Sequence, residues 1–143
     1  MAVDLLAIYP SVETVPKELP PTARNYLEQA IGTLHAPDGA AMLAGSAVDA
    51  MLKKKELTEG SVYSRIEAAV EKQILTADMG EWAHEVRLGS NRPRHSDSES
   101  PHVTLEQARQ SVEFAKILGQ ILFVLPSRVA KRGFDCESGD PNT

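Results

Sequence analysis

The segment from Thr104 to Leu125 constrains the fold most, because it carries the clearest helical pattern in the chain. Its apolar side chains recur at steps of three and four residues, which place them on one face of a helix. These positions are Leu105, Ala108, Val112, Ala115, Leu118 and Leu122. Thr104 and Gln107 have the spacing of a capping box, in which each side chain accepts a hydrogen bond from the other residue's backbone. The segment therefore predicts a long helix at the centre of an all-α core.

Four earlier segments also have helical spacing, and each opens on a residue suited to a helix start. Their first residues are Pro21, Asp38, Ser61 and Thr76. The last three of these are predicted to cap their helices through side-chain oxygens. In the third segment the apolar positions are predicted to face the core, and Arg65 is predicted to face water. The sequence thus predicts five helices.

Length and composition indicate one globular unit. The chain has 143 residues, 42% hydrophobic and 24% charged, which is typical of a single soluble domain. We therefore predict a single-domain helical bundle over residues 20–131. An extended, proline-containing segment at 1–19 precedes it, and a disordered tail at 132–143 follows it.

The charge and the cysteine content limit the classes of function that the chain can have. A net charge of −5 argues against a nucleic-acid binder that uses its whole surface, although it leaves room for a local basic site. The one cysteine, Cys136, excludes a disulfide framework within the chain and suits a cytoplasmic protein. The apolar run at the start has no basic residue before it and ends at Pro10, so we predict neither a signal peptide nor a membrane anchor.

The stretch from Trp82 to His95 is the richest in possible chemistry. It contains the only tryptophan, two of the four histidines and three arginines. Trp82 is predicted to lie on the fourth helix and to pack against the last one. Gly89 is predicted to end the fourth helix, because glycine favours the conformations that terminate helices. His95 would then lie just beyond a helix end.

This stretch, Trp-Ala-His-Glu-Val-Arg-Leu followed by Asn91 and His95, resembles domain-of-unknown-function family 4145, which is bacterial and phage-borne. The resemblance covers about residues 18 to 131. That family in turn resembles the HEPN superfamily (higher eukaryotes and prokaryotes nucleotide-binding), whose paired helical domains include metal-independent ribonucleases with a nearby arginine and histidine. Here seven residues separate Arg87 from His95, and Asn91 is the alternative motif partner.

Two hypotheses follow for this stretch. In the first, Arg87, Asn91 and His95 form a catalytic site in which His95 transfers protons and an arginine stabilises the charged phosphorane. RNA or a nucleotide would then bind His84, Arg92 and Arg94. In the second, His95 and Asn91 only hold the loop to the helix end, and Arg87 pairs with Glu81, Glu85 or another acid.

We expect neither a metal nor a cofactor. The four histidines show no pair at a recognised metal spacing, and the sequence has no phosphate-binding loop, dinucleotide-binding loop or serine-hydrolase elbow.

The favoured function is a non-catalytic regulatory or partner-binding module in a nucleic-acid-linked process, such as bacterial defence or restriction. The alternative is a metal-independent endoribonuclease. Both contexts come from the resemblance. Excess apolar residues between Phe114 and Leu125, together with the paired arrangement of the resembled superfamily, also predict a homodimer. A protein partner is a further expectation.

Overall fold

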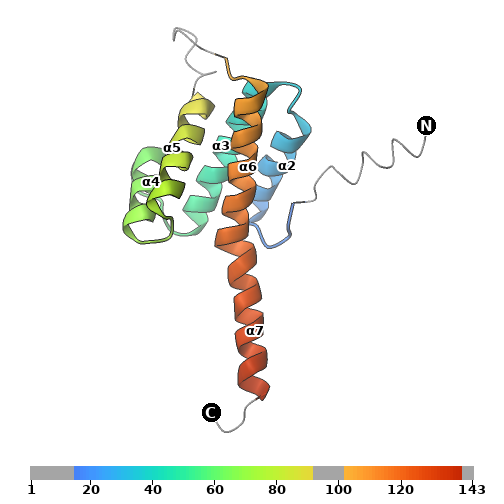
Figure 1. The fold of residues 1–143 in the computed structure, drawn as a ribbon, viewed down its shortest axis with the longest axis vertical. Helices are drawn as coiled ribbons and strands as arrows, with labels where there is room; N and C mark the ends of the chain where they lie inside the picture. The colour runs from blue at the N-terminus through green and yellow to red at the C-terminus, as the bar shows by residue number, and fades with distance from the viewer. Residues whose placement is uncertain (1–14, 92–101, 140–143) are drawn as a thin grey trace, which may run out of the picture.

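The computed structural model describes residues 15–91 and 102–139, and within them it is helical with no strand. The helices are α2 (Pro21–Gly32), α3 (Pro37–Lys54), α4 (Val62–Glu71), α5 (Ala77–Asn91) and α6 (Leu105–Gly119). A π-helix, η3 (Gln120–Val124), continues α6 directly into α7 (Leu125–Gly139), so α6, η3 and α7 form one long helix (Figure 1). The predicted all-α fold with a long last helix is confirmed.

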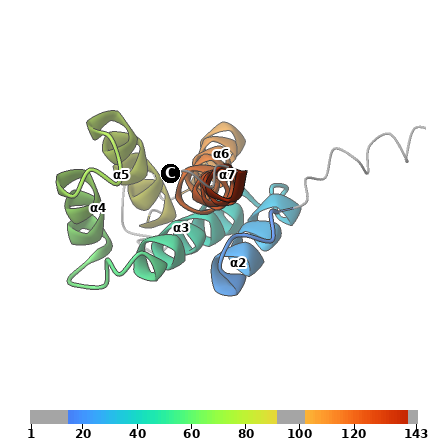
Figure 2. The ribbon, with the colours of Figure 1, turned by 90° about the horizontal axis from the view of Figure 1, so that it is seen from below.

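The helix that organises the bundle is α3, which packs against α2, α4, α5 and α6. Seen from below, α2 and α4 lie toward opposite ends of the arrangement, with α5 and the long helix between them (Figure 2). The long helix contributes α6 to this core. Its α7 part extends away from the other helices (Figure 1).

Small side chains let α3 approach its neighbours closely. Ala40, Ala44 and Ala47 are fully buried on it. A Cβ atom added at Gly45 would lie only 2.5 Å from Ser90 Cβ on α5, so the two helices nearly touch there.

Large side chains fill the remaining core. The largest fully buried ones come from four helices: Leu27, Met51, Leu52, Ile66, Phe114 and Leu118. The Trp82 ring on α5 packs against Phe114 on α6, with 5.1 Å between ring centroids. This contact confirms the predicted packing of the tryptophan against the last helix.

Three of the four predicted caps are present. The side chain of Ser61 accepts a hydrogen bond from the Ser64 backbone, and Thr76 accepts one from Met79. Thr104 and Gln107 form the complete capping box. These helix starts depend on neighbouring residues only, which is why local spacing predicts them.

The predicted cap at Asp38 is wrong. The helix α3 begins at Pro37 with Ala36 as its N-cap, and Asp38 lies inside the first turn. Its carboxylate accepts a hydrogen bond from the Val103 backbone at 2.7 Å and pairs with His102 Nδ1 at 2.7 Å. The Val103 N–H, followed by the His102 hydrogen bond, lowers the pKa of this carboxyl. Asp38 therefore anchors the segment leading into α6.

Two helix ends also differ from prediction. α5 passes Gly89 and reaches Asn91, where the buried Ser90 side chain packs against α3. Glycine costs a helix only about 1 kcal/mol relative to alanine, so tertiary packing can override it. The last helix continues to Gly139, past the predicted boundary at Lys131. The π-helix ends at Val124, two residues before Pro126, whose ring removes one backbone donor.

The predicted extended segment at 1–19 is described only from residue 15, where Val15 and Leu19 are buried against the helices. Among the described helices, none combines the length and the apolar character needed to cross a membrane.

Candidate functional site

The α5 helix presents different residues to α4 and to α6, which are two of its neighbours. His84, Arg87 and Asn91 recur at steps of three and four residues and share one side of the helix. Trp82 and Val86 lie on another side, beside α6. The described residues of the 82–95 stretch thus form two groups: one faces α4, and the other lines a groove along α6.

His84 is held by two residues of α4. Its Nε2 lies 2.8 Å from Glu67 Oε2, and its ring lies 4.7 Å from the ring of Tyr63, centroid to centroid. The side chain of His84 is four-fifths buried, whereas that of Glu67 is about half exposed. His84 therefore links α5 to α4 through a polar contact and an aromatic one.

Arg87 follows one turn later and contacts the same tyrosine. Its guanidinium carbon lies 5.4 Å from the centroid of the Tyr63 ring, a cation–π arrangement. In the described part of the chain Arg87 makes no ion pair with Glu81 or Glu85, which the second hypothesis had offered as partners. The arginine is thus bound by an aromatic face rather than by one of those acids.

Two buried nitrogen atoms in this cluster have no hydrogen-bond partner among the described residues. They are His84 Nδ1 and Arg87 Nε. A buried donor or acceptor without a partner typically lowers the stability of the fold by about 1–3 kcal/mol, so these two atoms are an energetic cost within the cluster. We name Tyr63, Glu67, His84 and Arg87 the α4–α5 cluster.

The structure describes only part of the predicted catalytic site. Asn91 is the last residue of α5, half-buried and one turn beyond Arg87. His95, Arg92 and Arg94 lie outside the described residues. The predicted grouping of Arg87, Asn91 and His95 therefore stays a prediction.

A groove of about 210 Å³ lies between α5 and α6. Trp82, Val86, Leu88 and Gly89 line it from α5, and Gln107, Gln110 and Ser111 line it from α6. Glu85 is the charged residue in its described lining. We name this the α5–α6 groove.

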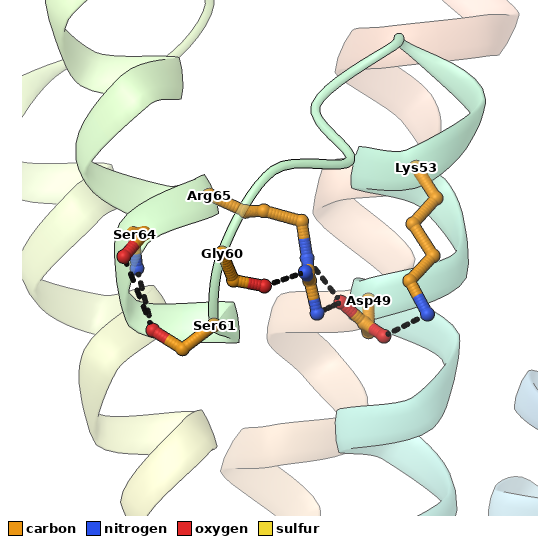
Figure 3. Close-up of polar contacts among 6 residues, drawn as sticks. All are labelled: Asp49, Lys53, Gly60, Ser61, Ser64 and Arg65. Atoms are coloured by element: carbon orange, nitrogen blue, oxygen red, sulfur yellow. Dashed lines mark hydrogen bonds and ion pairs between the residues drawn. The ribbon is translucent and has the colours of Figure 1, made fainter.

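A polar network around Arg65 is the feature that sequence analysis missed (Figure 3). The side chain of Arg65 is buried, although it was predicted to face water. Its Nε donates to Asp49 Oδ1 at 2.9 Å, and its Nη1 donates to the Gly60 carbonyl. Lys53 reaches the other oxygen of Asp49 at 3.0 Å. The network joins α3, the following loop and α4.

Spacing could have revealed this arginine. Arg65 lies three residues after Val62, directly before Ile66 and four before Ala69, so it belongs to the buried side of α4. A charged residue at such a position requires a partner, which Asp49 supplies.

The chain matches a protein-family model. The family model described as Domain of unknown function (DUF4145) matches residues 29–133, well over half of the chain. The chain belongs to the DUF4145 family. No curated protein and no solved structure matches it.

The DUF4145 match begins within α2 and ends within α7. It therefore includes the α4–α5 cluster, the α5–α6 groove and the Arg65 network. The resemblance identified from residues 82–95 pointed to the same family, over nearly the same range of the chain.

Within the described ranges of this DUF4145 protein, no three histidine, cysteine, aspartate or glutamate side chains group closely enough to hold a metal ion. His84 with Glu67 and His102 with Asp38 form pairs of two residues each.

Proposed function

We propose that this DUF4145 protein is a non-catalytic regulatory or partner-binding module in a nucleic-acid-linked process of the bacterial defence or restriction type. The observation that carries the proposal is the engagement of His84 and Arg87 within the α4–α5 cluster. Glu67 holds the Nε2 of His84 at 2.8 Å, and Tyr63 lies beneath the Arg87 guanidinium.

These contacts favour binding over catalysis for a geometric reason. A general acid or base must reach the proton it transfers, directly or through one water. His84 is the histidine of the 82–95 stretch that the structure describes, and it does not meet this requirement, because one of its nitrogens is occupied by Glu67 and the other is buried. Arg87 and His84 therefore serve the packing of α4 on α5. Tyr63, which is half exposed, leaves an aromatic surface beside a cation, a combination that suits recognition of a partner.

The nucleic-acid context rests on a two-step resemblance: residues 82–95 resemble the DUF4145 family, and that family in turn resembles the HEPN superfamily. The same resemblance and the exposed apolar residues of the long helix, Ile121, Leu125 and Val129, support a homodimer as part of the proposal. The net charge of −5 supports a protein partner over a broad nucleic-acid contact.

The test combines an activity assay with partner capture. Purified parent protein should leave single-stranded and transfer RNA intact across roughly pH 6 to 9. Tagged parent protein should retain a nucleic-acid-processing component from its own cells, and Tyr63→Ala should lose that component. Tyr26→Ala, at a half-buried tyrosine on α2, serves as the control substitution. Robust RNA cleavage by the parent would overturn the proposal.

The second candidate is a metal-independent endoribonuclease that uses Arg87, Asn91 and His95. The unpartnered Arg87 Nε and the position of Asn91, one turn after Arg87 and four residues before His95, favour it. In that case His95 is the acid or base, and Arg87 stabilises the phosphorane across a dimer cleft.

This candidate makes sharper demands. Cleavage should survive a chelator, should require the ribose hydroxyl and should fall about 10²–10⁴-fold in His95→Ala. Arg87→Lys should also lose activity, because an ammonium does not reproduce the guanidinium fork. His35→Ala, at an exposed histidine, is the matched control. Equal cleavage by His95→Ala and the parent would exclude the candidate.

A further inference from the structure

The α7 helix projects from the bundle, and none of the labelled helices α2 to α5 lies alongside it (Figure 1). Among the described elements, its substantial packing is with η3, the π-helix that precedes it. Because α7 continues α6 and η3, it needs no nucleation of its own, but most helix stability in proteins comes from burying one face. Packing the exposed side of α7 against a partner surface would therefore stabilise this helix.

That side is apolar and basic. Leu125, Arg128, Val129 and Arg132 recur at steps of three and four residues, so they share one face of the helix. Leu125 is 55% exposed and Val129 is 61% exposed. Lys131 adds a third cation, and no acid occurs between Leu125 and Arg132 although the chain as a whole is acidic. We name Leu125, Arg128, Val129 and Arg132 the α7 face.

The α5–α6 groove has the complementary chemistry. Its floor and walls include Trp82, Val86 and the half-exposed Leu88, which offer apolar surface. Glu85 lines it, and Glu81 lies one turn earlier on α5, exposed to solvent. No lysine or arginine is among its described lining residues. An apolar helix face with flanking cations therefore fits this groove better than an acidic one would.

The positions of the two surfaces determine which copy can fill the groove. The groove lies beside the amino-terminal half of α6, where Gln107, Gln110 and Ser111 line it. The α7 face lies at the other end of the same continuous helix. A chain therefore cannot place its own α7 in its own groove. Two antiparallel copies, in contrast, would bring each α7 to the groove of the other.

We propose that two copies of this chain pair antiparallel, with the α7 face of each copy seated in the α5–α6 groove of the other. This inference rests on the proposed homodimer and assigns its interface. The arrangement is isologous: one two-fold axis forms both contacts, so every surface used appears twice. Leu125 and Val129 supply apolar contact with the groove, while Arg128 and Arg132 face the Glu81 and Glu85 side.

The experiment exchanges the charges of the two surfaces in the full-length chain. One variant carries Arg128→Glu with Arg132→Glu, and the other carries Glu81→Lys with Glu85→Lys. In a homodimer of the first variant, an acidic α7 would meet an acidic groove at both contacts. In a homodimer of the second variant, a basic α7 would meet a basic groove. Each variant should therefore be monomeric when it is alone, where the parent is dimeric. In a mixed dimer, the acidic α7 of the first variant meets the basic groove of the second. The unaltered basic α7 of the second variant meets the unaltered acidic groove of the first. The mixture should therefore restore a dimer.

Size-exclusion chromatography with light scattering measures these states, and thermal melts confirm that each variant folds. A third variant, Lys54→Glu with Lys72→Glu, makes the same charge change at exposed positions on α3 and after α4, and it should stay dimeric.

The outcomes separate the two proposals. A monomeric parent would overturn both the homodimer and its interface. A parent that instead binds single-stranded RNA through Arg128 and Arg132 would show that the α7 face contacts RNA and not a second copy of the chain. A dimeric parent whose α7 variant is also dimeric would overturn the interface alone. Monomeric variants that stay monomeric when mixed would exclude the groove as the seat of α7.

Discussion

Arg65 of α4 and Asp49 of α3 form a close ion pair at a site where the arginine is almost fully covered. Arg65 Nη2 lies 2.8 Å from Asp49 Oδ1, and the side chain of Arg65 is only 9% exposed. The same guanidinium donates to the Gly60 carbonyl, so one side chain fixes both the neighbouring helix and the loop between them (Figure 3).

Replacing Arg65 with leucine should destabilise the fold by about 2–3 kcal/mol, because the Gly60 carbonyl loses its donor and Asp49 loses its closer partner. Chemical denaturation of parent and variant measures the difference in the free energy of unfolding. The expected loss is large because hydrogen bonds to charged, covered groups contribute more than exposed ones.

Lys53→Met is the matched control, since Lys53 pairs with the same carboxylate but is 53% exposed. An exposed pair spaced four residues apart on a helix contributes about 0.3–0.5 kcal/mol, so this loss should be much smaller. Equal losses in the two variants would contradict the assigned role of Arg65.

Gly45→Ala should destabilise the protein by about 1–2 kcal/mol even though alanine favours helices. A Cβ atom there would lie 2.5 Å from Ser90 Cβ, so α3 and α5 must move apart. Overpacking typically costs about 1–3 kcal/mol. The gain in helix propensity offsets up to about 1 kcal/mol of this cost. Thermal and chemical denaturation measure the net effect.

Gly32→Ala provides the comparison, because a Cβ added at Gly32 meets no atom within 4 Å. The substitution should be neutral or stabilise the protein by up to about 1 kcal/mol, since it reduces the freedom of the unfolded chain. A stabilising effect at both glycines would show that α3 and α5 do not pack as closely as the structure indicates.

The sequence predicts most of the fold where local chemistry decides it. Ser61, Thr76 and Thr104 start their helices through contacts only three residues away, and apolar spacing identifies the buried side of α6. The predictions fail where a contact between residues far apart in the sequence determines the local structure. Gly89 does not end α5, because packing beside Ser90 continues the helix.

The candidate site was predicted less well for the same reason. The sequence identified His84 and Arg87 as notable, but it did not predict that Tyr63 and Glu67 of α4 would contact them. These contacts depend on how α4 packs against α5. Likewise the buried pair of Arg65 and Asp49 joins residues 16 positions apart, beyond the reach of helical spacing.

Asp38 gives a prediction for acid stability. Hydrogen bonds from the Val103 backbone and then from His102 hold the pKa of its carboxyl below the ordinary value of 3.8. A carboxyl with a lowered folded-state pKa stabilises the protein fully above its unfolded pKa. That stabilisation is lost as the pH falls through the lower, folded-state value. The contribution of Asp38 should therefore be complete at neutral pH and should disappear below about pH 4.

Asp38→Asn should accordingly lower the melting temperature at neutral pH, and its difference from the parent should shrink as the pH falls below about 4. The neutral amide keeps an acceptor for the Val103 N–H but loses the charge that attracts His102. Asp78→Asn controls for a charge lost from the first turn of a helix, because Asp78 occupies the first turn of α5 and is exposed. Melting curves of the three proteins across the acid range provide the measurement. If Asp38→Asn and Asp78→Asn shift the melting temperature equally at every pH, the link between α3 and the segment before α6 contributes nothing specific.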